Sequence, residues 1–144
     1  MIRVIAIGKL RDRRLADLTA EFARRIAGMA PFSMVELRDE APDREAKAML
    51  AQLGSAGGHE LVVALDERGE DLTSRDLAEM LGRQGSVAFL VGGPDGLGQA
   101  VRDRAGRTLR LSALTLPHEL ARLVVVEQIY RALTILHHRA YHRE

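Results

Sequence analysis

Short apolar segments alternate with segments of helical periodicity along most of this chain. Short, mainly apolar runs bounded by glycine or polar residues predict strands, at residues 2–7, 61–65, 87–91 and 109–111, and a short strand with polar alternation is predicted at 34–37. Apolar residues three and four positions apart predict amphipathic helices, at residues 15–29, 44–53, 73–81, 99–104 and 117–137. The alternation predicts an α/β fold in one domain, residues 1–144, with a parallel-rich sheet covered by helices on both faces.

The predicted helix at 117–137 is apolar around nearly its whole circumference. Leu120, Leu123 to Val126, Ile129 and Leu133 leave it little polar surface, whereas a helix at the surface of a small protein keeps a polar face. Two explanations are open: the helix is a central core element, or it forms the interface of a homodimer. The sequence favours the interface.

The composition is that of an ordinary globular protein and excludes several kinds of site. The 144 residues are 47% hydrophobic and 28% charged, and none is cysteine. A disulfide scaffold, a thiolate metal site and a cysteine nucleophile are therefore excluded. No apolar run is long enough for a membrane span, and the first ten residues lack the features of a signal peptide. We expect a cytoplasmic protein with no membrane association.

The net charge of +1 conceals an uneven distribution of charge. Residues 1–35 and 80–144 each carry four more basic than acidic groups, while residues 36–79 carry seven more acidic than basic groups. This asymmetry permits nucleic-acid contact through both ends of the chain. With two tyrosines, three phenylalanines and no tryptophan, a stacking platform for single-stranded nucleic acid is not expected.

A glycine-rich loop, Gly92 to Gly98, follows the most hydrophobic predicted strand. Gly93 and Gly98 have the spacing of a phosphate-binding loop, but Gln99 and Ala100 replace its lysine and hydroxyl residue, which argues against a nucleotide hydrolase. A dinucleotide-binding fingerprint would follow the first strand, not the fourth. Two readings remain, a structural turn and a small-molecule site at the carboxyl end of a parallel strand.

The segment from Leu111 to Arg122 leads from the last predicted strand into the long helix. Thr115 and Pro117 are suited to the beginning of a helix. His118 and Arg122 are four residues apart and so share one helix face near its positively charged end.

Protonatable and anion-binding side chains are concentrated at the C-terminus, in His137 to Glu144. Chain ends usually fray, but histidine is the side chain suited to moving protons near neutral pH. A metal site is not expected, because no carboxylate or thiol lies at a matching spacing.

Three segments in order, VGGPDGLG (91–98), LSALTLPHELARLVVVEQIYRA (111–132) and AYHRE (140–144), resemble one family closely. The chain is similar over essentially its whole length to the small SPOUT-class methyltransferases that modify N3 of a pseudouridine in 23S ribosomal RNA, the RlmH family. The resemblance implies a C-terminal trefoil knot, a homodimer, and the assembled ribosome as substrate. It also implies S-adenosylmethionine, without a metal, held by knot loops that map onto Leu65, Gly92, Gly93, Leu111, Ser112, Ala113, Leu114, Thr115 and Leu116.

We expect the catalytic groups to come from the tail. The imide nitrogen of a uracil-type base is a poor nucleophile until it is deprotonated, so a base or a cation near its oxygen would help. We assign His142 as the proton acceptor, Arg143 as the clamp on an oxygen or phosphate, and Tyr141 as a positioning contact. His118 and Arg122 are expected beside them, and the facing subunit is one of the two chains that could contribute these two side chains. The alternative is a non-catalytic ribosome-binding or RNA-binding module with a vestigial cofactor pocket.

Overall fold

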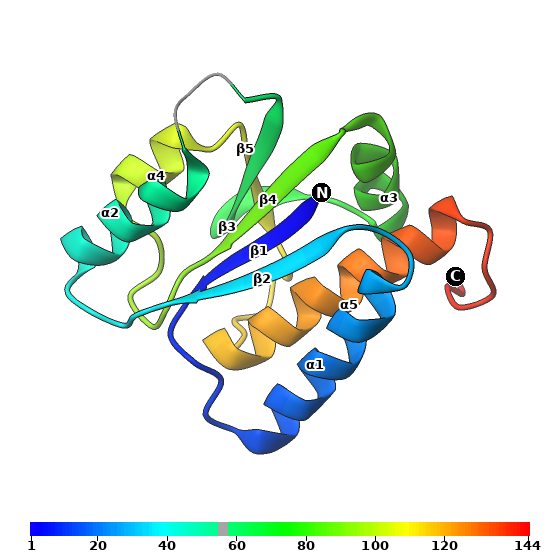
Figure 1. The fold of residues 1–144 in the computed structure, drawn as a ribbon, viewed down its shortest axis with the longest axis horizontal. Coiled ribbons are helices and arrows are strands. Elements are labelled where there is room, and N and C mark those ends of the chain that lie inside the picture. The colour runs from blue at the N-terminus through cyan, green and yellow to red at the C-terminus, as the bar shows by residue number, and fades with distance from the viewer. Residues whose placement is uncertain (55–57) are drawn as a thin grey trace.

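The computed structural model describes residues 1–54 and 58–144 (Figure 1). Strands and helices alternate regularly along the chain. In order they are β1 (Ile2–Ile7), α1 (Arg13–Ala27), β2 (Phe32–Leu37), α2 (Pro42–Leu53), β3 (Glu60–Asp71), α3 (Ser74–Arg83), β4 (Ser86–Val91), α4 (Gln99–Arg104), β5 (Arg107–Arg110) and α5 (His118–Leu136).

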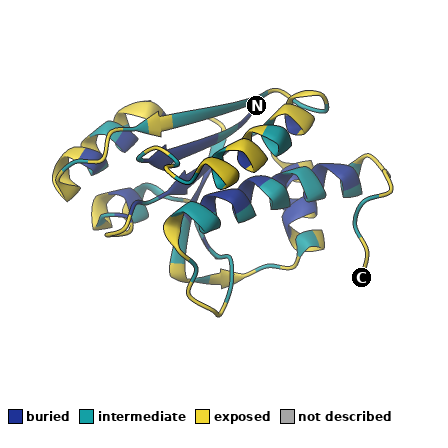
Figure 2. Ribbon diagram, turned by 90° about the horizontal axis from the view of Figure 1, so that it is seen from below, coloured by how far each residue is buried: buried dark blue, intermediate teal, exposed yellow. Residues whose placement is uncertain are grey.

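The five strands form one parallel sheet in the order β2-β1-β4-β3-β5. Because successive side chains of a strand point to opposite faces, Val4 and Ala6 of β1 enter the apolar core beneath α1, α3 and α5, while Ile5 and Ile7 enter the core beneath α2 and α4. Figure 2 shows the buried residues concentrated between these layers. The predicted α/β fold with helices on both faces is confirmed. The trefoil knot stays an implication of the resemblance.

Helix α5 lies between α1 and α3 on one face of the sheet (Figure 1). Val125, Val126 and Ile129 are each 0% exposed and belong to the core of their own chain. The central-core explanation therefore accounts for these three residues, whereas Leu120 and Val124 remain partly exposed in the single chain. The homodimer itself stays a prediction. No helix within residues 1–54 and 58–144, α5 included, is long and apolar enough to cross a membrane.

Strand β3 continues beyond the predicted end at Leu65. Its pairing with β5 shifts register, so that Leu65 and Glu70 both lie opposite Leu109. Gly69 makes this possible, because a Cβ there would lie 2.6 Å from the carbonyl carbon of Leu109. The sequence indicated only a turn around Gly69, since residues 66–71 are too polar to read as a strand. They pair nonetheless, supported by the Arg110–Asp71 ion pair at 2.7 Å.

The other differences from the predicted elements are shifts of element ends. Strand β2 begins at Phe32 and helix α2 at Pro42, both two residues earlier than expected. Proline is suited to the first turn of a helix because its missing N–H would have no partner there. Strand β5 also begins two residues early, at Arg107, and ends at Arg110.

Candidate functional site

A cavity of about 150 Å³ opens at the edge of the sheet where β4 and β5 end and where β3 shifts its register, at Leu65 to Glu67. Ligands of open α/β sheets bind at this edge, outside the carboxyl ends of the strands. The cavity is lined by Leu65, Asp66, Glu67, Val91, Gly92, Gly93, Gly96, Leu109, Arg110, Leu111, Ser112, Leu114, Thr115, Leu116, His118 and Ala121. We refer to it as the strand-end pocket.

The structure brings eight of the nine predicted cofactor residues together in the strand-end pocket. They are Leu65, Gly92, Gly93, Leu111, Ser112, Leu114, Thr115 and Leu116. Ala113 is exposed and does not line it. The loop after β5, which carries the residues from Leu111 to Leu116, is held locally. The Ser112 hydroxyl accepts a hydrogen bond of 2.9 Å from the backbone N–H of Leu114. Leu114 is 77% exposed at the rim.

The glycine loop folds tightly on itself. A Cβ on Gly92 would lie 2.6 Å from the carbonyl carbon of Gly96, and a Cβ on Gly93 would lie 3.2 Å from Cγ2 of Ile7. Gly96 has a φ of 72° and donates a 2.9 Å hydrogen bond to the carbonyl of Gly93. A side chain at Gly92 would collide with the loop's own backbone, and one at Gly93 would crowd Ile7. The loop that forms without these side chains lines the pocket.

His118 and Arg122, expected side by side in the site, have different environments. His118 lines the strand-end pocket. Arg122 is 1% exposed, and its guanidinium donates to Glu36 at 2.7 Å and to the carbonyls of Ile7 and Gly8 at 2.8 and 2.9 Å. Burial lowers the pKa of Arg122, and the Glu36 carboxylate opposes that shift. The structure does not bring Arg122 to the pocket; it joins the start of α5 to the ends of β1 and β2.

The C-terminal tail packs against α5 instead of fraying. The Tyr141 hydroxyl donates to Glu127 at 2.9 Å, and the Tyr141 ring lies 4.8 Å from the ring of Tyr130. Arg131 pairs with Glu127 at 2.8 Å and lies 3.2 Å from Nδ1 of His142. Burial raises the pKa of Tyr141, and its hydrogen bond to Glu127 raises it further.

Within one chain, the tail and the strand-end pocket lie apart. Glu127, which holds the tail, follows His118 by nine positions, which is about 14 Å along an α-helix and about 180° around it. In Figure 1 the C-terminus lies at the far end of α5 from the strand ends. The structure therefore places the predicted catalytic residues in two separate groups.

A comparison with protein families shows the family to which this chain belongs. The model of the family described as "Predicted SPOUT methyltransferase" matches residues 1–142. The chain belongs to the SPOUT methyltransferase family.

Curated relatives of this SPOUT methyltransferase are similar over nearly their whole length. The protein named "Ribosomal RNA large subunit methyltransferase H" of Anaeromyxobacter sp. (strain Fw109-5) is 46% identical, over 99% of this chain and 99% of the relative. The protein of the same name from Prochlorococcus marinus (strain MIT 9303) is also 46% identical, over 98% of this chain and 91% of the relative.

A solved structure, titled "The structure of a probable methylase family protein from Haemophilus influenzae Rd KW20", has the same fold. It matches with a TM-score of 0.58 over 99% of this chain and 70% of that chain. At 14% identity, this likeness concerns the fold alone.

Sequence reasoning missed several polar residues of this SPOUT methyltransferase that line the pocket, above all Asp66, Glu67 and Arg110. Asp66 accepts a 2.8 Å hydrogen bond from the backbone N–H of Arg68, and one of its oxygens lies 3.3 Å from Nε of Arg102. The available signal was position: polar residues directly after a buried parallel strand lie at the edge where ligands bind.

Proposed function

We propose that this chain transfers a methyl group from S-adenosylmethionine to N3 of a pseudouridine in 23S ribosomal RNA, acting on the assembled ribosome. The observation that carries the proposal is the pocket formed by β3, β4, β5 and the 112–117 loop in a chain of the SPOUT methyltransferase family. The curated relatives, whose name assigns them to large-subunit ribosomal RNA, support the choice of substrate.

The pocket lining fits the chemistry of this cofactor. Leucines from β3, from β5 and from the loop after β5, among them Leu65, Leu109 and Leu116, offer an apolar surface for the adenine ring. Asp66 and Glu67 offer carboxylates for hydroxyl and ammonium groups. When bound, S-adenosylmethionine supplies an electrophilic methyl group on a positively charged sulfur.

The pocket of one chain is smaller than a complete cofactor site. Its volume of about 150 Å³ compares with about 300–1,000 Å³ for typical ligand pockets. The largely exposed Leu114 at the rim offers apolar surface that further contacts would cover. We infer that a second copy of the chain completes the enclosure.

The residues of the tail would supply the chemistry at the target base. His142 would accept the N3 proton, Arg143 would hold an oxygen of the base or a phosphate, and Tyr141 would position the ring. His118, already at the pocket, would face them. Most of the rate then comes from orientation, since transfer from a sulfonium needs little besides an aligned nucleophile.

Because tail and pocket of one chain lie at opposite ends of α5, we propose that the tail of one subunit serves the pocket of its partner in a homodimer. The hydrogen bonds of the tail are to partly exposed groups, with Glu127 18% and Arg131 24% exposed. Such contacts can open at low cost. Arg122 takes a positioning role in this arrangement, because its side chain is buried and both terminal nitrogens donate inside the fold.

The direct test is methyl transfer to ribosomes. Purified protein, S-adenosylmethionine with a labelled methyl group, and 70S ribosomes from a strain lacking this activity should yield labelled N3-methylpseudouridine, identified by mass spectrometry of rRNA nucleosides. The cofactor should also raise the melting temperature by mass action. Ribosome binding without methyl transfer or cofactor stabilisation would support the non-catalytic module instead.

A mixed-subunit experiment tests the shared site. One chain lacks residues 141–144 and keeps its pocket; the other keeps its tail and carries Ala121→Phe, which adds a ring to a cavity of about 150 Å³. Thr115→Trp, at an exposed position of the same lining, is a second blocking variant. Each homodimer should be inactive and the co-expressed mixture active. An inactive mixture of folded chains would show that tail and pocket act within one chain.

A further inference from the structure

A second and larger cavity, of about 830 Å³, adjoins the strand-end pocket. It lies at the carboxyl ends of β1 and β2, between residues 7–11 on one side and 36–39 on the other, with Pro94 and the first turn of α5 closing it. His118 lines both this cavity and the strand-end pocket. The two cavities are therefore joined at a residue already placed in the active site. We call the larger one the β1–β2 groove.

Two carboxylates in the wall of the β1–β2 groove are occupied by donors of the protein itself. Glu36 pairs with Arg122 at 2.7 Å and accepts from the backbone N–H of Leu10 at 3.4 Å. Glu119 accepts from the backbone N–H of Arg11 and, at 3.1 Å, of Asp12. These carboxylates hold the walls of the groove together and have fewer free lone pairs for a ligand.

The cations of the same wall are free. Lys9, Arg11 and Arg38 are exposed, and none of them forms an ion pair within residues 1–54 and 58–144. Asp39 is the one remaining carboxylate of this lining, so free cations outnumber it. The lining holds as many acidic as basic side chains, but the three cations are the charged groups left free for an anionic ligand.

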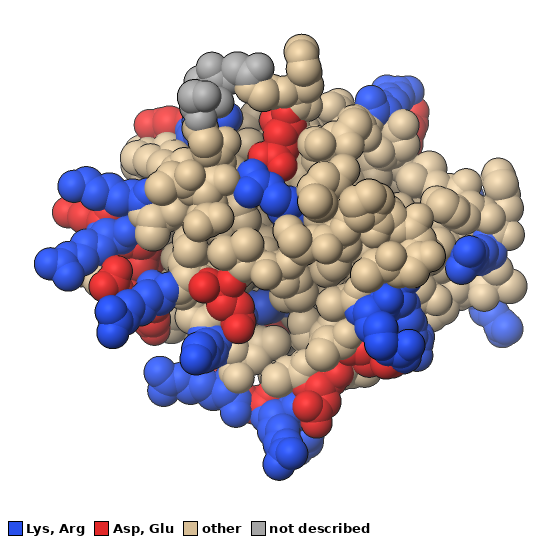
Figure 3. Space-filling model, viewed as in Figure 1, with Lys and Arg blue, Asp and Glu red and all other residues tan. Residues whose placement is uncertain are grey.

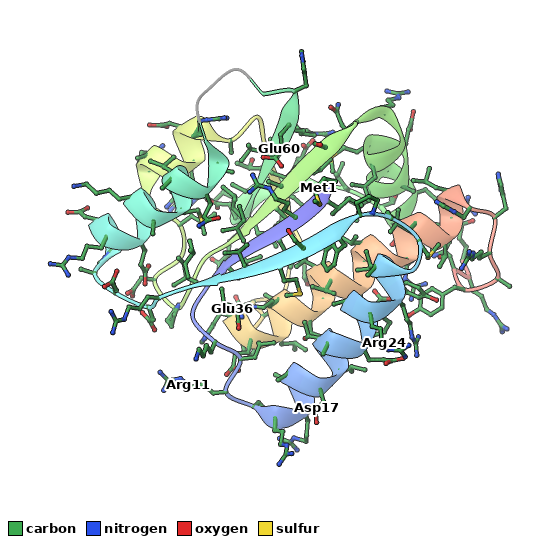
Figure 4. All side chains as sticks on the ribbon, in the orientation of Figure 1. Met1, Arg11, Asp17, Arg24, Glu36 and Glu60 are labelled. Atoms are coloured by element: carbon green, nitrogen blue, oxygen red, sulfur yellow. The ribbon has the colours of Figure 1, made fainter. Side chains whose placement is uncertain are left out.

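The groove cations differ from other surface cations in position. Arg24 on α1 and Arg83 on α3 are also exposed, but they pair with Glu21 and Glu79 of their own helices. Other exposed cations, such as Arg13 and Arg44, lack an ion pair within residues 1–54 and 58–144 as well, but only the groove cations line a cavity that adjoins the strand-end pocket. Figure 4 labels Arg11 on the loop after β1, projecting away from the sheet beside Glu36, and Figure 3 shows Lys and Arg side chains interspersed with Asp and Glu along this part of the rim.

We propose that the β1–β2 groove binds the sugar-phosphate backbone of the rRNA strand that carries the target nucleotide, with Lys9, Arg11 and Arg38 contacting phosphates. The target base would then enter the strand-end pocket past His118. Phosphates supply most of the affinity and the register of protein–nucleic acid complexes, and arginine pairs with them in a bidentate way. The identity of the nucleic acid rests on the proposed function.

The groove is held in shape before any ligand arrives. Gly8, with a φ of 81°, turns the chain at the end of β1, and its carbonyl accepts a 2.9 Å hydrogen bond from the buried Arg122. The backbone N–H of Gly8 donates to Leu37 at 2.7 Å. Lys9 and Arg11 therefore start from an anchored loop, which lowers the entropic cost of binding.

The experiment compares two double variants that remove the same charge from different places. Arg11→Gln with Arg38→Gln removes two groove cations, and Arg24→Gln with Arg83→Gln removes two paired cations of the helices. Binding to 70S ribosomes is measured by sedimentation at several salt concentrations, and S-adenosylmethionine binding by calorimetry. The groove variant should bind ribosomes about tenfold more weakly or worse, with its log–log salt slope reduced by about 1.4 to 1.8 for two lost phosphate contacts. The helix variant should match the wild type, and both should keep cofactor affinity.

Three results would overturn the proposal: ribosome binding of the groove variant equal to that of the helix variant, weaker binding with an unchanged salt slope, or loss of cofactor affinity in the groove variant. Failure of the proposed function is separate. A wild-type protein that binds ribosomes but transfers no methyl group would overturn the catalytic assignment, while the comparison of the two variants would still decide whether the groove is an RNA-binding surface.

Discussion

The two ends of α5 carry similar side chains in different environments. Near its start, the guanidinium of Arg122 is 1% exposed and enclosed by Glu36 and the carbonyls of Ile7 and Gly8. Beyond its end, His142 and Tyr141 rest on Arg131 and Glu127, which are 24% and 18% exposed. Sequence reasoning treats both groups as catalytic candidates, because each combines histidine with arginine.

Because of this difference, Arg122 stabilises the fold, whereas the side chains of the tail are available for chemistry. The two terminal nitrogens of Arg122, Nη1 and Nη2, donate to acceptors of the same chain, so removing the side chain leaves buried carbonyls without partners. The tail makes a few hydrogen bonds to partly exposed groups, so it can exchange them for a substrate or a partner subunit. The following predictions test this contrast, from the largest expected effect to the smallest.

Deleting residues 141–144 should abolish methylation with little effect on the fold. Loss of the proposed base, clamp and positioning contact together should reduce turnover by about 1,000-fold or more. The free energy of unfolding should fall by about 1–2 kcal/mol at most, because the lost contacts are few and partly exposed: the hydrogen bonds to Glu127 and Arg131, the packing of the Tyr141 ring on Tyr130 and Arg131, and the exposed Glu144–Arg75 ion pair. Urea denaturation and methyl transfer to ribosomes measure the two effects.

Cofactor binding is the control for this deletion, because the pocket lining contains no residue after Ala121. In the full-length chain, single changes separate the roles. His142→Ala should lower turnover with little change in ribosome affinity, whereas Arg143→Ala should weaken ribosome binding and its salt dependence. Full activity of the truncated chain would move the catalytic assignment to His118.

Arg122→Leu should have the opposite effect, a large loss of stability. Two buried carbonyls and the Glu36 carboxylate lose their partner, which should cost about 3 kcal/mol of unfolding free energy. The matched change near the tail, Arg131→Leu, removes an ion pair with partly exposed partners and should cost about 0.5–1 kcal/mol. Urea denaturation of both variants measures the two losses of unfolding free energy, so that they can be compared. Equal losses would remove the contrast between the two ends of the helix.

Substitutions in the glycine loop should give an intermediate loss of stability. Gly92→Ala places a methyl group 2.6 Å from the backbone of Gly96, so the loop must shift, at a cost of about 2 kcal/mol. Gly98→Ala is the control, because its Cβ would meet Cβ of Ala46 at an ordinary 3.7 Å. A loss of cofactor affinity should accompany the first change and not the second. Equal melting temperatures for the two variants would contradict this account of the loop.

Much of the fold follows from local patterns in the sequence. The strand at 87–91 is apolar throughout because both faces of β4 are covered, and its residues divide between the two cores. The second half of β3 could not be predicted in this way. Its polar residues pair only because Gly69 approaches Leu109 closely, a tertiary contact that no local pattern encodes.

The sequence predicted which residues line the candidate site better than it predicted how they are arranged. Residues after buried strands, such as Gly92 and Leu111, were expected at the pocket and lie there. The spacing of His118 and Arg122 indicated a shared face, but spacing cannot tell a solvent-facing position from one beneath a strand end. The 1% exposure of Arg122 depends on β1 and β2, which lie far away in sequence.

The titration of Tyr141 provides the smallest and most local test of the tail. Burial first, and the hydrogen bond to Glu127 second, raise the pKa of Tyr141 above its usual value of 10.0. The folded protein therefore favours the neutral phenol. The stability from this contact is complete below pH 10 and is lost as the pH rises through the folded-state pKa.

The absorbance of tyrosinate measures this pKa directly, because the chain has two tyrosines and no tryptophan. The difference between the titration curves of the wild type and Tyr141→Phe isolates Tyr141, and its midpoint should lie above pH 10. Glu127→Gln keeps the burial and removes the carboxylate, so the midpoint should move part of the way back. A midpoint at or below 10 in the free protein would mean that the tail does not rest on α5 in solution, and the contrast between the two ends of the helix would then be one between a fixed end and a frayed one.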